Sequence, residues 1–92
     1  MNMRFPLGHI VATPAALEAL SNTSTNALKL LRRHARGDWG DLCAEDIEAN
    51  LLGLATGGRV MSSYPLPGTD QCIWIITEAD RSVTTILLPS DY

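Results

Sequence analysis

The segment Thr77–Thr85, TEADRSVTT, gathers the side chains best suited to chemistry, because it carries two carboxylates, a guanidinium and four hydroxyls. On adjacent strand ends, such groups could bind a phosphate or position a reacting group. A structural alternative is that Asp80 and Ser82 bond to the turn backbone while Glu78 pairs with Arg81 at the surface. The candidate binding residues of this segment are Glu78, Asp80, Arg81, Ser82 and Thr84.

A second polar group lies on the preceding segment of alternating period and comprises Arg59, Ser62 and Tyr64. In an antiparallel meander, the start of this strand lies near the end of the CIWIIT strand, so Arg59 could approach Glu78. An arginine held by a carboxylate suits an anion site, and equally an ion pair that fixes strand register. For a nuclease, the candidate catalytic residues would be Arg59, Tyr64, Glu78 and Arg81.

A third candidate is a basic helix, whose cations Lys29, Arg32, Arg33 and Arg36 share one face by spacing. Cations near a helix C-terminus complement its dipole, so this face could contact phosphates or simply be solvated. His34 lies among these arginines, where the sequence predicts a surface position and, as a minor alternative, a general base.

Motifs for cofactors and metals are missing from the sequence. Cys43 and Cys72 have neither CxxC spacing nor nearby histidines, and no P-loop, GxSxG, HExxH or GxGxxG pattern occurs. We therefore expect no metal and no cofactor. Trp39 and Trp74 are expected in the core or under a turn, and His9 has little support as a functional group.

Composition predicts a globular chain of 92 residues, with 46% hydrophobic and 18% charged residues, forming a single domain over residues 1–92. The net charge of −3 argues against a general nucleic-acid coat protein, because phosphate binding usually needs a basic excess. The apolar runs are only as long as strands, and the N-terminal segment lacks a secretory pattern. We expect a cytoplasmic protein that does not enter membranes.

Helix and strand signals divide the chain clearly. Thr13-Pro14 is a typical helix start, Gly37 and Gly57-Gly58 are typical helix ends, and the period changes to two at Arg59. The expected elements are a loose arm at 1–7, a short strand at 9–12, helices at 14–20, 25–36 and 44–55, and strands at 59–66, 72–77 and 83–88.

Short connections between the last three strands predict an antiparallel meander, since parallel strands need long crossovers. The helices are expected to cover one face of this sheet, which gives a two-layer α+β domain. The short strand at 9–12 could pair along one edge. An exposed edge could also pair with a second copy, so a homodimer is one alternative.

Four segments carry a resemblance that covers nearly the whole chain: LGHIVATPAAL, GDWGDL, GGRVMSSYPLP and IWIITEADRSVTTILLP. They resemble a family of small proteins encoded on bacterial plasmids and integrative elements, some of which are labelled type I restriction modification subunits. The resemblance implies a mobile-element setting and no particular activity. A DNA methyltransferase would need a longer cofactor-binding domain and an amide-Pro-Pro-aromatic motif.

The order of elements is also similar to the barnase- and RelE-type ribonuclease fold, in which helices precede an antiparallel sheet that carries the active site. This weaker likeness implies phosphate-binding and acid–base roles around Arg59, Tyr64 and Arg81. Residues 78–82 contain no histidine, so the barnase-like general acid has no counterpart there.

Three functions follow as hypotheses. The sequence favours a non-enzymatic accessory module that binds a protein partner, with modulation of host defence as one role. A ribonuclease, or a decayed relative, would use Arg59, Glu78 and Arg81. A small DNA-binding regulator would use the helix Lys29–Arg36.

Overall fold

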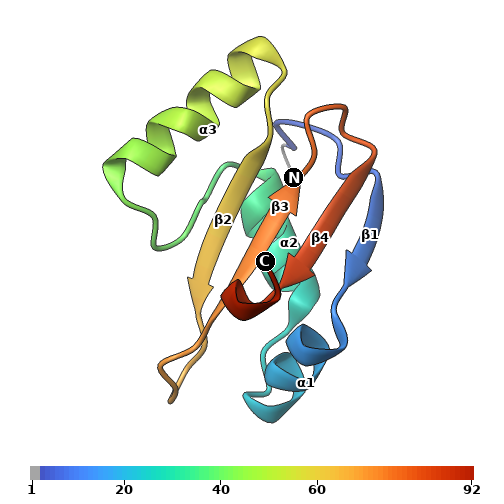
Figure 1. Cartoon of the computed structure of the whole chain (residues 1–92), viewed down its shortest axis with the longest axis vertical. Coiled ribbons are helices and arrows are strands. Elements are labelled where there is room, and N and C mark those ends of the chain that lie inside the picture. The colour runs from blue at the N-terminus through green and yellow to red at the C-terminus, as the bar shows by residue number, and fades with distance from the viewer. Residues whose placement is uncertain (1–2) are drawn as a thin grey trace.

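A computed structural model describes residues 3–92, which form three α-helices and a four-stranded sheet (Figure 1). The strands are β1 (His9–Ala12), β2 (Val60–Pro65), β3 (Cys72–Thr77) and β4 (Val83–Leu87). The helices are α1 (Pro14–Asn22), α2 (Ala27–Ala35), α3 (Ala44–Thr56) and the short 3₁₀ turn η1 (Pro89–Asp91).

The sheet has the strand order β1-β4-β3-β2 and mixes both pairing directions. β2, β3 and β4 form the antiparallel meander that their short connections predict. β1 joins β4 in parallel, with Ile10 opposite Thr84, so the sheet is not purely antiparallel. The crossover that a parallel pair needs is supplied by the whole helical region between the two strands.

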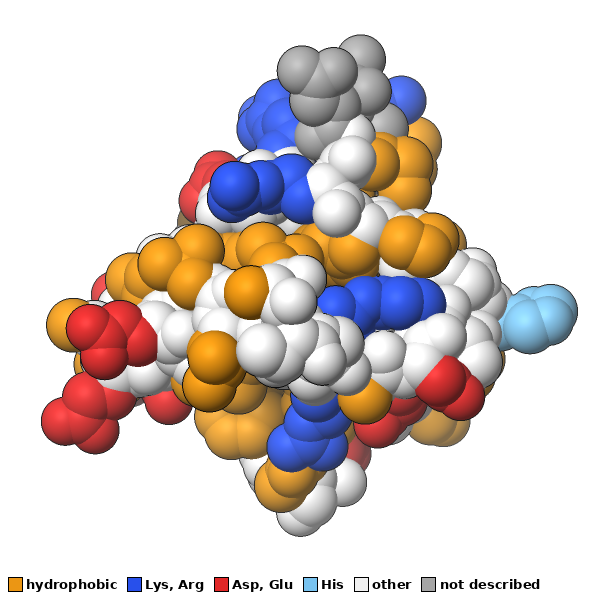
Figure 2. Space-filling view, turned by 90° about the horizontal axis from the view of Figure 1, so that it is seen from above, with side chains coloured by type: hydrophobic (Ala, Val, Ile, Leu, Met, Phe, Trp, Pro, Cys, Tyr) orange, Lys and Arg blue, Asp and Glu red, His pale blue; other side chains and the backbone are white. Residues whose placement is uncertain are grey.

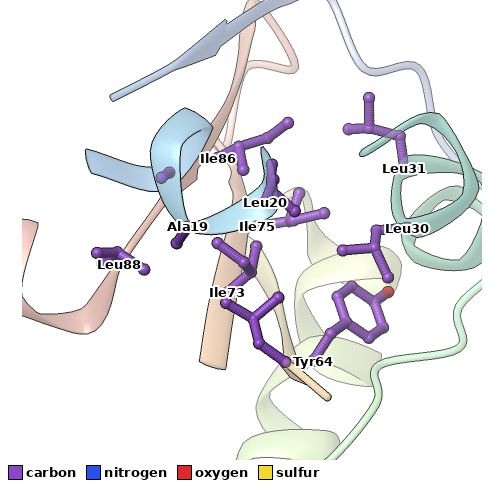
Figure 3. Packing of buried hydrophobic residues seen from close by; sticks show 11 residues of the cluster. Ala19, Leu20, Leu30, Leu31, Tyr64, Ile73, Ile75, Ile86 and Leu88 are labelled. Carbon is purple, nitrogen blue, oxygen red and sulfur yellow. The ribbon is translucent and has the colours of Figure 1, made fainter. Parts of the chain in front are cut away.

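The main core lies between one face of the sheet and the helices α1 and α2 (Figure 3). Alternate strand residues such as Ile73 and Ile75 point into it and are fully buried. Helix α1 starts as expected, with the Thr13 hydroxyl accepting from the Ala16 amide at 3.1 Å. The labelled core residues are Ala19, Leu20, Leu30, Leu31, Tyr64, Ile73, Ile75, Ile86 and Leu88.

Helix α3 lies beside the edge strand β2 rather than over the core face, contrary to the expectation for all three helices. The Asn50 amide donates to the Met61 carbonyl at 2.7 Å, and its oxygen accepts from the Met61 amide at 2.9 Å. Farther along β2, the Ser63 amide donates to the Trp39 carbonyl and its carbonyl accepts from Asp41. The outer edge of β2 is therefore occupied.

Three leucines of the helices are about half exposed: Leu17, Leu28 and Leu51. Their helical spacing is compatible with burial, but the helices meet the sheet through the neighbouring residues, such as Ala19 and Leu30. The predicted boundaries at 14–20 and 25–36 also shift, to Pro14–Asn22 and Ala27–Ala35.

The N-terminal segment packs against the domain where a loose arm was expected over residues 1–7. Phe5 is buried, and the Arg4 amide donates to the Ala35 carbonyl at 2.8 Å. Residues 1 and 2 lie outside the described residues. Every helix in residues 3–92 is too short or too polar to cross a bilayer.

Candidate functional site

Two polar residues of the turn after β3 bond to each other. The amide and hydroxyl of Ser82 donate to the Asp80 carboxylate at 3.0 and 2.6 Å. These bonds lower the pKa of Asp80, the Ser82 hydroxyl bond more than the amide bond. The geometry matches the structural alternative for Asp80 and Ser82, a side-chain-stabilised turn.

Arg81 links this turn to the end of α3. Its backbone is left-handed, with φ of 61°, which is uncommon outside glycine. Its guanidinium donates to the carbonyls of Gly58 at 2.7 Å, Glu78 at 3.1 Å and Gly53 at 3.2 Å. The guanidinium carbon also lies over the Phe5 ring, 5.5 Å from the ring centroid. These partners saturate much of the guanidinium, so Arg81 serves to tie α3 to the sheet.

Arg59 lies on the opposite side of the sheet. It donates to the Tyr92 hydroxyl at 2.7 Å, and Tyr92 packs edge-on against Trp74 on the face that α1 and α2 leave open. Arg81, by contrast, reaches Phe5 on the helix side. Within residues 3–92, the only ion pair joins Arg33 and Asp38, so neither Arg59 nor Arg81 is paired with Glu78. The bond to Tyr92 and, less strongly, the nearby charge of Glu78 raise the pKa of Arg59, so Glu78 lies near Arg59 without forming an ion pair with it. The two guanidiniums are each bonded to other partners.

Ser62, Thr77 and Thr84 form a buried hydrogen-bond chain with His34 (all four side chains fully buried). Ser62 contacts His34 Nδ1 at 2.6 Å, His34 Nε2 contacts Thr77 at 2.9 Å, and Thr77 contacts Thr84 at 2.7 Å. Thr84 donates to the Leu7 carbonyl at 2.7 Å. Because that carbonyl can only accept, each hydroxyl must donate toward Leu7, which leaves the proton on Nε2 and makes Nδ1 the acceptor.

The surroundings of His34 hold it neutral. Burial and, less strongly, the nearby positive charge of Arg81 together lower the pKa of His34 to about 4. The rings of Phe5 and Trp39 close around it, with ring centroids 5.2 and 5.8 Å away. The predicted surface position of His34 is therefore wrong. Its neighbouring arginines suggested the surface, but its two hydrogen-bond partners, Ser62 and Thr77, come from strands far along the chain.

Tyr64 is also committed to the fold. Its hydroxyl donates to the Asp38 carbonyl at 2.6 Å, and Arg33 stacks over its ring at 4.5 Å. Burial raises the pKa of Tyr64 to about 12. Arg33 in turn bonds the Asp38 carboxylate at 2.7 Å. Tyr64 therefore supplies no accessible phenolate, and Arg33 is not free to bind a phosphate.

The predicted basic face of α2 is divided between two hollows. Lys29 and Arg33 line one of about 330 Å³ beside Pro67. Arg32 lines another on the side of β1. Arg36 is exposed beyond the last turn of α2. The four cations thus do not form a single contact stripe.

The hollow beside β1 is an apolar groove with a volume of about 220 Å³. Two of the residues that line it are about half exposed, Ile10 at 49% and Leu28 at 54%, although both belong to regular elements. Its lining residues are Met3, Leu7, Ile10, Leu28, Leu31, Arg32 and Ala35.

β1 is an edge strand of the sheet (Figure 1), and Ile10 within it and Leu7 before it line the groove. The amides of His9 and Thr13 donate inward to β4, to Ser82 and Ile86. Since backbone groups alternate along a strand, those of Ile10 and Ala12 point outward. No other strand in residues 3–92 pairs with this edge.

Gly8 allows β1 to approach β4 this closely. It has φ of 65°, and a Cβ there would lie 2.3 Å from the Ser82 carbonyl oxygen. The groove was not predicted from the sequence, because Ile10 and Leu28 look like ordinary core residues. A signal was available in α2: leucines at 28, 30 and 31 span more of the helix surface than one narrow buried stripe needs.

Residues 3–92 contain no group of three His, Cys, Asp or Glu side chains placed to hold a metal ion. The candidate site is the apolar groove together with the outer edge of β1. Comparisons of the chain with protein-family models, with curated proteins and with solved structures gave no match.

Proposed function

We propose that this protein is a non-enzymatic protein-binding module whose binding surface is the groove between β1 and α2. The observation that carries the proposal is the pair of half-exposed apolar side chains, Ile10 and Leu28, facing one apolar hollow. Covering the exposed half of each would contribute about 1 kcal/mol of binding free energy. A contiguous apolar groove on a small domain is a common mark of a partner site.

The other two functions draw less support from the geometry. A ribonuclease needs Arg59, Glu78 and Arg81 around one phosphodiester, whereas the two guanidiniums bond to groups on opposite sides of the sheet. A DNA-binding regulator needs a row of free cations on α2, whereas Arg33 is held by Asp38. The resemblance to small plasmid proteins adds a mobile-element setting, and modulation of host defence, to the proposal.

A displayed library of random ten-residue peptides tests the binding surface directly. We expect the wild-type protein to enrich peptides, and Leu28→Glu to lose them by about tenfold or more, because a carboxylate would be buried in the apolar groove. Leu28 is half exposed, so the variant should fold, which circular dichroism and thermal unfolding would verify.

The matched control is Leu52→Glu, the same change at an exposed leucine of α3 that does not line the groove. It should bind the selected peptides as the wild type does. Failure to enrich any peptide, or equal losses in both variants, would contradict the proposed binding surface.

A further inference from the structure

We infer that the partner segment is an acidic extended strand that pairs with the outer edge of β1 as a fifth strand of the sheet. This inference rests on the proposed function and specifies its partner. It combines three features of the same region: an unpaired strand edge, an apolar groove and an excess of positive charge.

The strand edge determines the mode of binding. Ile10 and Ala12 present outward amides and carbonyls, which an added strand would satisfy. The opposite sheet edge offers no such place, because Asn50 and the segment at Trp39 already bond to β2. Along an added strand, every second side chain would point to the groove side, toward Leu28 and Leu31. Those positions should be apolar.

The charge distribution determines the partner's sign. Residues 1–37 carry five of the seven Lys and Arg side chains and one of the ten carboxylates, Glu18. Residues 38–92 carry the other two cations and nine carboxylates. The strand β1 and the helix α2, which form the groove, both belong to the positive half. Arg32 lines the groove itself and has no carboxylate within 4 Å among residues 3–92.

In Figure 2 many of the acidic side chains lie toward the left, the side on which Figure 1 places α3, and others lie at the lower right. Several Lys and Arg side chains lie at the top of the view. Asp80 and Asp91 bond to residues beside the two ends of β1, so the positive charge beside the groove is that of Arg32 and its neighbours on α2. This charge favours association with an acidic segment.

Two other occupants fit these features less well. A second copy pairing through its own β1 would bring two positive halves together, which costs free energy. A nucleic acid would need several phosphate contacts, whereas six of the seven groove residues are apolar.

The test uses peptides selected from the same random library, after sequencing. We expect an excess of Asp and Glu over Lys and Arg, with apolar residues at alternate positions. N-methylation of alternate backbone amides in a selected peptide should abolish binding in one register and spare it in the other, because only one set of amides faces β1.

The charge arm of the test compares Arg32→Glu with Lys29→Glu. Both variants change the net charge equally on α2, but only Arg32 lines the groove. We expect Arg32→Glu to weaken binding of the selected peptide about tenfold and Lys29→Glu to weaken it much less.

The outcomes separate the two proposals. Peptides that depend on Leu28 but lack an acidic excess, or that tolerate both N-methylation patterns, would overturn this inference and leave the binding module intact. No Leu28-dependent peptide at all would overturn both. A single-stranded RNA oligonucleotide that displaces the peptide at equal concentration, or dimerisation through β1 in place of peptide binding, would also overturn the acidic-strand assignment.

Discussion

At the residue scale, the side chains that look most reactive in the sequence are mostly used inside the fold. The chain from Ser62 through His34, Thr77 and Thr84 satisfies four polar side chains that would otherwise be buried without partners. A serine, a histidine and a threonine that bond to one another in a row would suggest catalysis if they were exposed to solvent. Here all of them are fully buried, and the proton order is fixed by the Leu7 carbonyl.

The His34 side chain predicts a specific pH dependence of stability. Its folded-state pKa of about 4 lies below the value of 6.5 in the unfolded chain, so between these values the unfolded state binds more protons. The contribution of His34 is therefore fully present above pH 6.5 and is lost as the pH falls toward 4. We expect the free energy of unfolding to drop by about 2 kcal/mol between pH 7 and pH 5.

Urea denaturation at pH 7, 6 and 5 measures this drop. His9→Gln, the same substitution at an exposed histidine outside the buried chain, is the matched control. His34→Gln should be less stable at pH 7 and nearly independent of pH over this range. An unchanged slope in His34→Gln would mean that other groups cause the pH dependence.

At the element scale, α3 is held by polar contacts with β2 and by the packing of Ile47 and Leu54 against a second small core around Trp39. Asn50 and Gly53 are its buried residues, while Leu51 and Leu52 are exposed. The Asn50 amide bonds both backbone groups of Met61 as a neighbouring strand would, and Arg81 holds the Gly53 carbonyl.

Replacing Asn50 should therefore loosen α3 and uncover the edge of β2. We expect Asn50→Ala to cost about 1–3 kcal/mol of unfolding free energy, because two backbone groups of Met61 lose their partners. Amide hydrogen exchange gives the residue-level measurement, with the Met61 amide losing protection. Asn50→Asp keeps the oxygen that accepts from Met61, so that amide should stay protected. The Ser63 amide, bonded to Trp39, is the internal reference.

Local signals in the sequence predicted most elements. Helices start or end in the structure at the expected signals, Thr13-Pro14, Gly37 and Gly57. The change of period at Arg59 predicts the start of the meander. These features depend on neighbouring residues only, so a single sequence contains them. Boundaries moved by one or two residues because capping competes with fraying at each helix end.

Long-range features were not predictable in the same way. The parallel pairing of β1 with β4 joins residues more than 70 positions apart, and no local pattern encodes it. The burial of His34 depends on hydroxyls 28 and 43 residues away. Arg81 looked like an anion ligand because its three carbonyl partners carry no side-chain signal. The polar residues that the sequence singled out therefore mostly bond within the fold, whereas the candidate groove beside Ile10 and Leu28 was not predicted.

At the scale of the whole molecule, the net charge of −3 conceals two halves of opposite sign. The positive half contains the unpaired edge of β1, and the negative half contains the edge of β2, which is closed by side chains and loop backbone. An open strand edge invites aggregation unless charge or cover prevents it. Like charges around β1 would keep two copies apart while leaving the edge open to an acidic partner.

This arrangement predicts how self-association depends on salt. We expect a monomer in analytical ultracentrifugation at about 0.05 M salt, where the Debye length exceeds ~10 Å and the positive halves repel each other. Raising the salt to about 0.5 M screens that repulsion, so any pairing through β1 should appear only there. Ile10→Lys, which adds charge at the edge, should abolish such pairing, whereas Leu52→Lys on α3 should not. A dimer at low salt that Ile10→Lys dissociates would contradict the electrostatic argument, because the edge would then pair despite the repulsion.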